Sequence, residues 1–399
     1  MTFDPTTPAF AADPCAHYAT LRQTAPVWFP PTSMWLLARH ADIARVATDP
    51  AMVRSLDGLA TSAEAAAQQE RENFHDMPFH ERFVQTSLLD SDGPKHRRLR
   101  REVFGAFQAR NLEALRPAIE AFVDERLTAV RGAGEIDFVA DFAAHIPGHV
   151  IGLFLGVPAE DAPRLREWSE TVVRYFDIDR MAEKKAAAEA ATREFAHYLE
   201  DLVAERRAHP RDDLISRMIE AERSDAYEGD ELIATAMLIL MAGHGSTIDV
   251  MGSGLHLLLL HPQALADLRA GADLDTAIQE IFRYEPPLPF FHRHALEDCK
   301  VAGREFPRGT TFGLLYASAN RDPAVFDRPD TFDIHRSPNR HLSFGQGAHL
   351  CLGNALARIN MRAVFERLIG CDLRLEADDI PYKPGLAVRG PERLPVSVT

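Results

Sequence analysis

The spacing of hydrophobic residues predicts a chain that is mainly α-helical, with a smaller β region. Apolar positions recur at helical spacing over long stretches, and stops such as residues 132–134 and 209–210 separate these stretches. The runs 27–29 and 34–37 are instead short, apolar and joined by a proline-containing turn, which predicts a β-hairpin. The predicted helices cover residues 40–48, 92–107, 112–131, 140–155, 163–176, 181–207, 214–223, 231–261 and 354–368.

Residues 55–90 interrupt this pattern, because they are polar and irregular apart from a helical segment near residues 63–74. A connection of this length inside a compact fold is usually functional or mobile. Alternatively, it is a solvent-exposed excursion with no role of its own. The pattern alone leaves both interpretations open.

Charge and cysteine content narrow the class of protein. A formal net charge of -15 disfavours a nucleic-acid-binding surface, which needs a local basic excess. Four scattered cysteines are too few for a disulfide framework and indicate a reducing compartment. The N-terminus lacks a signal-peptide pattern, and no apolar window reaches membrane-spanning length without polar interruptions. We therefore expect a cytoplasmic monomer that binds neither nucleic acid nor membrane.

A cysteine-containing segment, Phe344-Gly-Gln-Gly-Ala-His-Leu-Cys351-Leu-Gly353, directly precedes the predicted helix 354–368. Its glycines free the backbone, and the dipole of the following helix favours a negatively charged sulfur. A lone thiolate is a poor zinc site but suits haem iron, which needs one strong axial ligand. Alternatively, Cys351 is a small buried hydrophobic residue, as most free cysteines are.

The same segment, written Phe-Gly-x-Gly-x-His-x-Cys-x-Gly, resembles the signature of the cytochrome P-450 haem-thiolate monooxygenases of the soluble bacterial type. The resemblance extends from about residue 25 to the C-terminus and includes four motifs in the expected order. It implies one domain over residues 1–399, with the P-450 fold, a triangular helical prism around a buried haem b. It also implies that Cys351 is the iron ligand and that the loop within 55–90 covers the substrate.

Five residues would contact the haem according to this resemblance. His96 and Arg100 are four apart on one helix face and would bind the haem propionates, although such a basic run is more often a solvated surface. Arg293, in an extended segment after a proline-rich stretch, would also bind a propionate. Phe344 would pack against the haem near the sulfur, and His349 would reach a propionate.

The longest predicted helix contains the sequence Ala-Gly-His-Gly-Ser-Thr at residues 242–247. Glycines inside a helix indicate that something large approaches the backbone, or that another helix packs closely. The family's pattern here is Ala/Gly-Gly-x-(Asp/Glu)-Thr, whose acid and alcohol help to deliver protons during oxygen activation. Ala242 and Gly243 match this pattern, but Gly245 replaces the acid and Ser246 replaces the threonine.

Proton delivery must therefore differ from the family's usual arrangement. Ser246 keeps a hydroxyl group, and Thr247 offers another that points about 100° away around the helix. Asp249, one turn after Gly245, could act through water, although polar residues in long helices more often bond to neighbouring structure. We expect proton delivery to rely on Ser246, ordered water or the substrate itself.

The sequence Glu280-x-x-Arg283 places both charges on one helix face, where a guanidinium can bind a carboxylate. Alone it would be an ordinary surface pair, but with Arg336 it resembles the family's structural triad, which implies a scaffolding role. Other apolar residues would line the substrate pocket by the same resemblance, although they could simply be core residues. These residues are Leu240, Met241, Leu288, Pro289, Phe290, Ala387 and Val388.

The resemblance implies a monooxygenase that inserts one oxygen atom from O2 into a small hydrophobic substrate by hydroxylation or O-dealkylation. Electrons would come from a ferredoxin and its reductase, docking on the cysteine side, where Arg358 and Arg362 would contribute charge. The missing acid keeps a peroxide-driven or oxidative-coupling haem enzyme as an alternative. A non-catalytic haem sensor or electron carrier is an alternative of another class.

Overall fold

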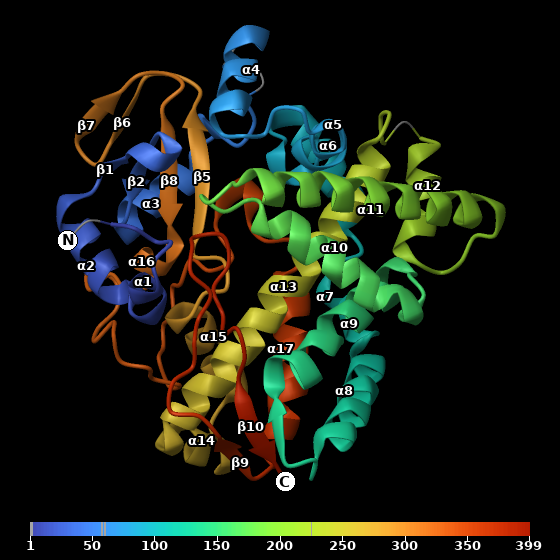
Figure 1. The fold of residues 1–399 in the computed structure, drawn as a ribbon, viewed down its shortest axis with the longest axis vertical. Helices are drawn as coiled ribbons and strands as arrows, with labels where there is room; N and C mark the ends of the chain where they lie inside the picture. The colour runs from blue at the N-terminus through green and yellow to red at the C-terminus, as the bar shows by residue number, and fades with distance from the viewer. Residues whose placement is uncertain (1–2, 57–58, 60, 225) are drawn as a thin grey trace.

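The computed structural model describes residues 3–56, 59, 61–224 and 226–399, and helices dominate it (Figure 1). A mainly α fold with a smaller β region is therefore confirmed. The α-helices are α1 (Pro8–Ala12), α2 (Pro14–Thr24), α3 (His40–Thr48), α4 (Ser62–Arg71), α5 (Pro78–His80), α6 (Gly93–Phe104), α7 (Ala109–Glu113), α8 (Arg116–Val130), α9 (Ile146–Leu155), α10 (Ala162–Arg174), α11 (Ala182–Ala208), α12 (Leu214–Glu222), α13 (Glu231–Leu260), α14 (Pro262–Arg269), α15 (Leu274–Tyr284), α16 (Tyr316–Ala319) and α17 (Asn354–Leu368).

Among the described residues, ten strands form three sheets, and the largest has the order β1-β2-β8-β5-β3. The predicted hairpin is confirmed, because β1 and β2 pair antiparallel. β2 also pairs in parallel with β8, and this brings the N-terminal hairpin against a segment almost three hundred residues away. The strands are β1 (Val27–Phe29), β2 (Met34–Leu37), β3 (Met52–Val53), β4 (Glu135–Asp137), β5 (Phe290–Ala295), β6 (Cys299–Val301), β7 (Arg304–Phe306), β8 (Thr311–Leu315), β9 (Leu373–Leu375) and β10 (Pro395–Val398).

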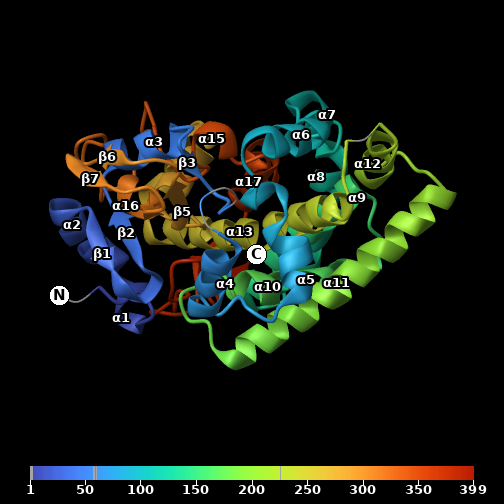
Figure 2. The same ribbon diagram turned by 90° about the horizontal axis from the view of Figure 1, so that it is seen from above.

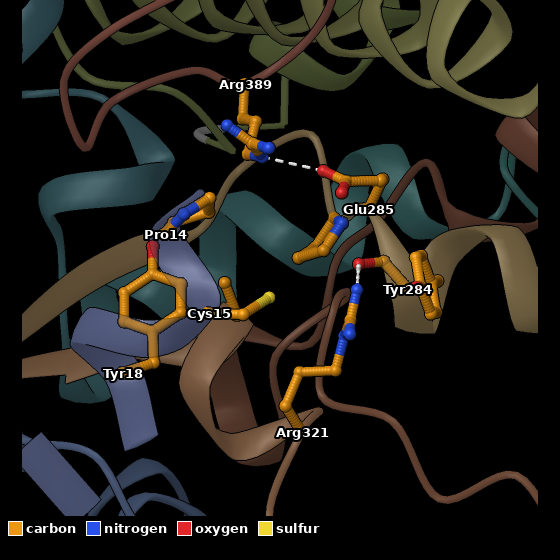
Figure 3. A pocket seen from close by; sticks show the side chains of 9 residues that line it. Pro14, Cys15, Tyr18, Tyr284, Glu285, Arg321 and Arg389 are labelled. Carbon is orange, nitrogen blue, oxygen red and sulfur yellow. Dashed lines mark hydrogen bonds and ion pairs between the residues drawn. The ribbon is translucent and has the colours of Figure 1, made fainter. Parts of the chain in front are cut away.

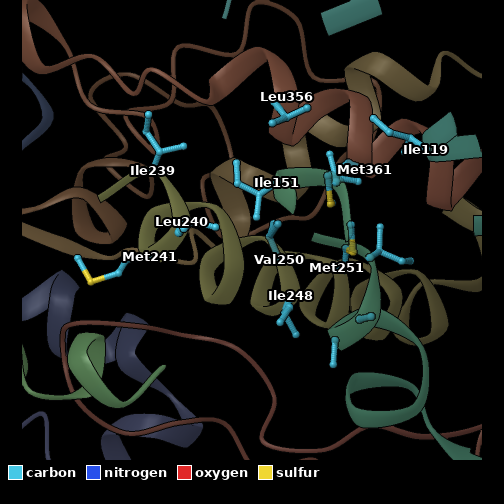
Figure 4. Packing of buried hydrophobic residues seen from close by; sticks show 14 of the residues in the cluster. Ile119, Ile151, Ile239, Leu240, Met241, Ile248, Val250, Met251, Leu356 and Met361 are labelled. Atoms are coloured by element: carbon cyan, nitrogen blue, oxygen red, sulfur yellow. The ribbon is translucent and has the colours of Figure 1, made fainter. Parts of the chain in front are cut away.

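Helix α13 crosses the middle of the molecule in both views (Figures 1 and 2). Helices α9, α10, α11, α15 and α17 all pack against it, and its apolar side chains form the centre of the main hydrophobic core (Figure 4). The segments Phe138–Leu155 and Glu231–Leu260 are long and apolar enough to cross a membrane, but 72% and 67% of their respective windows are buried inside the fold. Both are therefore core elements of the protein.

Two predicted helices are broken at prolines. The predicted helix 112–131 is two helices, α7 and α8, because Pro117 occupies the first turn of α8 and cannot continue a preceding helix. The predicted helix 140–155 begins as a π-helical turn, η4 (Phe138–Phe142), and a 3-10 turn, η5 (Ala143–His145), before α9 starts beside Pro147. Hydrophobic periodicity continues across both breaks, which is why the pattern suggested single helices.

The long connection 55–90 is more regular than its sequence indicated. The predicted helical segment near 63–74 corresponds to α4, which Thr61 begins with a capping box to Glu64. It is followed by α5, the π-helical turn η2 (Glu81–Gln85) and the 3-10 turn η3 (Leu88–Asp90). Positions 57, 58 and 60 of this connection lie outside the described residues.

Candidate cofactor site around Cys351

Cys351 lies in a tight turn that leads into α17. Its backbone N–H donates to the carbonyl oxygen of Phe344 at 2.8 Å. Gly345 and Gly347 have φ angles of 67° and 73°, which residues with a Cβ atom rarely adopt. A Cβ atom on Gly347 would also lie 2.5 Å from the carbonyl oxygen of Ala47. Glycine at this position therefore lets the cysteine turn lie directly against α3.

The side chain of Cys351 is exposed at this turn. The surrounding protein still removes part of its hydration, which raises the pKa of the thiol. The backbone amide of Gly353 and the cationic Arg100 and Arg358 act in the opposite direction, because they stabilise a negative sulfur. A cation bound to the sulfur would complete the stabilisation of the thiolate.

The middle of α13 has an exposed strip although the rest of the helix is largely buried. Ala242 is exposed and Gly243, Gly245 and Ser246 are partly exposed. A Cβ atom on Gly243 would lie 3.0 Å from Ile151, so this glycine allows α9 to pack closely. Apart from its two chain neighbours and the backbone of its own helix, no described atom lies within 4 Å of a Cβ atom built on Gly245, so this position faces open space. Close helix packing therefore explains Gly243, and the approach of a large group to the backbone stays a prediction for Gly245.

Three candidate propionate ligands are largely buried. His96 and Arg293 are each 3% exposed, and the His96 ring lies 4.3 Å from the ring of His349. His349 Nε2 lies 3.1 Å from Oδ1 of Asp92. Desolvation lowers the pKa of His96 to about 4 and that of Arg293 to about 10. Within the described part of the chain, Nε2 of His96 has no hydrogen-bond partner, and such a buried nitrogen suits a bound carboxylate.

Arg100 and an arginine that the sequence analysis missed complete this region. Arg100 donates to the carbonyl oxygen of Leu350 at 2.6 Å and so links α6 to the cysteine turn. Arg54 is 7% exposed, bonds to Asp90 at 2.6 Å and to the carbonyl oxygen of His292 at 3.3 Å. Arg54 directly follows the short strand β3 and belongs to no recognisable motif, so only the fold could reveal that it lies here.

These features fit haem. The cysteine turn offers one sulfur ligand, α13 leaves a strip of backbone uncovered, and the unpartnered His96 nitrogen and the buried Arg293 guanidinium can bind carboxylates. The fold and the site together define the class of haem-thiolate proteins.

Comparison with known proteins gives the family. The cytochrome P450 family model matches residues 52–273 and 274–380. The biotin biosynthesis cytochrome P450 of Bacillus subtilis is 32% identical over 395 residues, which is 97% of each chain. The 6-deoxyerythronolide B hydroxylase of Saccharopolyspora erythraea is 34% identical and covers 97% of this chain and 96% of its own. The chain therefore belongs to the cytochrome P450 family: it is a P450 monooxygenase that uses haem b.

Solved structures agree with this assignment. The crystal structure of CalO2 matches with a TM-score of 0.91 and 32% identity, over 100% of this chain and 99% of that one. P450BioI, crystallised with an acyl carrier protein bearing hexadec-9Z-enoic acid, matches with a TM-score of 0.89 and 30% identity, over 98% and 100%. The P450 fold expected from the cysteine motif is therefore confirmed.

Glu280, Arg283 and Arg336 lie in direct contact, as the resemblance implied. The carboxylate of Glu280 accepts two hydrogen bonds from Arg283, at 2.7 and 2.8 Å, and further bonds from Arg336 at 3.1 and 3.2 Å. Asn339 and the backbone N–H of Asp333 also donate to it. Arg283 in turn bonds to backbone carbonyls of the segment 320–331. This cluster ties α15 to the irregular segment before the cysteine turn.

The candidate pocket residues divide into two groups. Leu240 is fully buried in the main core (Figure 4), and Met241 and Pro289 are also buried. The structure thus favours the core interpretation for Leu240, which has no exposed surface to offer a substrate. The residues that keep partly exposed surface are Leu288, Phe290, Ala387 and Val388.

A separate small cavity lies between α2, the end of α15 and the segment around Arg389 (Figure 3). Arg389 donates to Glu285 at 2.6 Å, and Arg321 donates to the carbonyl oxygen of Tyr284 at 2.9 Å. The cavity volume is about 10 Å³, room for about one water molecule. It is therefore too small to be the substrate site.

Proposed function

We propose that the chain, as a single domain over residues 1–399, inserts one oxygen atom from O2 into a hydrophobic small molecule by hydroxylation or O-dealkylation. The observation that supports this most is the Cys351 turn combined with the exposed strip of α13. The turn offers a sulfur ligand, and the strip leaves room beside α13, which carries the hydroxyl group of Ser246. The partly exposed apolar residues Leu288, Phe290 and Val388 support a hydrophobic substrate.

In this site the haem supplies the oxidising chemistry, and the chain binds and orients it. The Cys351 sulfur would be the axial ligand. His96, Arg100, Arg293 and His349 would bind or steer the propionates through N–H donors, with His96 neutral at pH 7 because its pKa is about 4. Phe344, whose ring lies 5.1 Å from the guanidinium of Arg358, would shield the sulfur side.

The test of this function is a screen of terpenoids, aromatic acids and fatty acids against the haem-loaded protein. A compound that fits should displace the water ligand and change the spin state of the iron, as seen by absorbance. That compound should then be oxidised when a ferredoxin, its reductase and NADPH are supplied under oxygen. Binding without product in this system would refute the proposed function.

A peroxide-driven reaction is the second candidate, and Gly245 favours it because this position lacks the family's acid. The two candidates differ in their oxidant. Product from hydrogen peroxide alone, at a rate that matches or exceeds that of the complete electron-transfer chain, would favour the second candidate. Product that requires ferredoxin and oxygen would favour the first.

We propose that electrons arrive from a ferredoxin that docks beside the cysteine turn. Arg358 is exposed on α17 close to this turn, with its guanidinium 5.1 Å from the ring of Phe344. Arg362, also expected to contribute, instead pairs with Asp275 and Glu366 at 2.7 Å each. A cytoplasmic location is part of this proposal, and the free state of all four cysteines supports it.

Reversing the charge of Arg358 is expected to weaken this docking. Arg358→Glu should raise the KM for ferredoxin by about tenfold, because it replaces an attractive contact by a repulsive one. The effect should shrink at high salt. Arg374→Glu, a matched change on β9 beyond the far end of α17, should leave this KM unaltered. Equal KM values for the two variants would place the docking surface elsewhere.

Ser246→Ala is expected to increase the share of electrons lost as hydrogen peroxide severalfold, because the hydroxyl would position water for proton transfer. In the structure this hydroxyl donates to the carbonyl oxygen of Ala242 at 3.2 Å and keeps its lone pairs available. Ser246→Thr retains the hydroxyl and should keep peroxide low. Unchanged peroxide in Ser246→Ala would exclude this residue from the relay.

A further inference from the structure

Asp249 is a buried carboxylate in α13 that is only partly paired. It is 1% exposed, and Nζ of Lys383 donates to its Oδ1 at 2.5 Å. Its other oxygen, Oδ2, has no hydrogen-bond partner among the described residues. An ionised oxygen that is buried without a partner is costly, so a buried water molecule is expected to bind it.

The position of Asp249 along α13 places it on the face of the exposed strip. It follows Ala242 by seven residues, which is almost two full turns, and follows Ser246 by three. Side chains three or four residues apart on a helix are neighbours, with Cβ atoms about 5–6 Å apart. The space beside Gly245, one turn before Asp249, is open. A water molecule can therefore lie between Asp249 and Ser246.

Asp249 is also within reach of bulk solvent. Lys383 is 31% exposed, so its ammonium group can exchange protons with water outside the fold. The C-terminal segment that carries Lys383 lies directly against α13, because a Cβ atom on Gly390 would be 2.5 Å from the Cβ atom of Asp249.

The other charged and titratable groups that face Asp249 are Glu170 and Arg174 of α10 and Tyr382 of the C-terminal segment. Burial raises the pKa of Asp249, and Lys383 partly offsets this effect. A carboxyl group whose pKa is raised in this way can hold a proton more readily than one in water.

We propose that Asp249 and Lys383 form the proton-delivery pair of this enzyme and replace the acid that is absent at Gly245. The Lys383 ammonium donates a proton to Oδ1 of Asp249, Oδ2 of Asp249 passes a proton through water to the hydroxyl of Ser246, and the Lys383 amine regains a proton from bulk solvent. The reaction consumes the substrate, one O2, two protons and two electrons from ferredoxin, and it releases the oxygenated product and one water molecule. When a proton arrives late, the same electrons and protons leave as hydrogen peroxide. This inference rests on the proposed monooxygenase function.

The pair could instead only anchor the C-terminal segment to α13. Three variants distinguish these roles: Asp249→Asn keeps the size of the side chain, Lys383→Met removes the ammonium, and the double variant Gly245→Asp/Asp249→Asn moves the acid to the family's usual position. The open space beside Gly245 leaves room for the new carboxylate. If the pair only anchors the C-terminal segment, the double variant should give no more product per NADPH than Asp249→Asn does.

The experiment measures peroxide and product per NADPH for each haem-loaded variant, with the screen compound that gives the largest spin-state change. Product yield should fall about tenfold in Asp249→Asn, in keeping with the loss of a general acid. It should also fall in Lys383→Met and recover in the double variant. A wild-type yield in Asp249→Asn, or no recovery in a double variant that binds haem fully, would overturn the proposal.

A crystal structure of the haem-loaded wild-type enzyme provides a test that does not depend on turnover or on the folding of any variant. Water should lie within about 3.2 Å of both Oδ2 of Asp249 and Oγ of Ser246. If no water is bound at Oδ2, the proposal is wrong. Wild-type turnover is measured first, so that a failure of the monooxygenase function itself is recognised separately.

Discussion

Cys351→His is expected to retain haem but to lose the reduced carbon-monoxide spectrum of thiolate-ligated iron, together with oxygenation of the substrate. Imidazole can bind iron, but it donates less electron density to the iron than a thiolate does. The stronger donation by the thiolate is what favours cleavage of the O–O bond. Loss of a group that only orients a metal ligand typically lowers metal affinity or activity by about 10–100-fold. Loss of the ligand itself should lower turnover by more than that. Visible spectroscopy and product analysis check both expectations.

The exposed turn around Cys351 makes this change informative, because the side chain is not needed to fill the core. Cys299→Ser provides the control, since Cys299 lies in β6 and is partly exposed. That variant should keep the wild-type spectrum and turnover. A thiolate-type carbonyl spectrum in Cys351→His would mean that another sulfur binds the iron, and the site described here would be wrong.

Local patterns predicted the helices well, and their failures have a physical cause. Hydrophobic periodicity located α13 within one residue at its C-terminal end, since a long buried helix has a strong pattern. It missed the breaks at Pro117 and Pro147, where apolar spacing continues although the backbone cannot. It could not predict the parallel pairing of Trp35 with Phe312, because such pairing depends on the whole fold.

In the candidate site too, features set by a local sequence could be predicted, whereas features set by the whole fold could not. The cysteine turn is a continuous segment with a specific sequence, so a glycine-rich turn at Cys351 before α17 could be predicted from the sequence alone. Arg54 and Lys383 are single charged residues without a motif, and only tertiary structure brings them to Asp90 and Asp249. For Leu240 the sequence left a pocket and a core interpretation open. It lies in the core, because helical phase places it about 200° from the exposed Ala242.

Glu280→Ala is expected to prevent stable haem incorporation. The carboxylate is 0% exposed and is the partner of Arg283, which is also 0% exposed, so its removal leaves a buried guanidinium without its countercharge. Breaking one partner of a buried pair costs about 3–5 kcal/mol, a large part of the roughly 5–15 kcal/mol that holds a typical domain folded. The cluster also holds Arg336 and the backbone of Asp333 before the cysteine turn. Disorder there should displace Cys351.

Urea unfolding and the ratio of haem to protein absorbance measure these effects. Asp212→Ala is the matched control, because it breaks an ion pair with Arg217 in which Asp212 is 94% exposed. Exposed pairs contribute about 0–1 kcal/mol, so this variant should unfold like the wild type and bind haem fully. Comparing Asp212→Ala with Glu280→Ala separates the effect of losing an exposed carboxylate from the effect of breaking a buried network. A Glu280→Ala protein with full haem content and unchanged urea stability would show that the cluster does not support the cysteine turn.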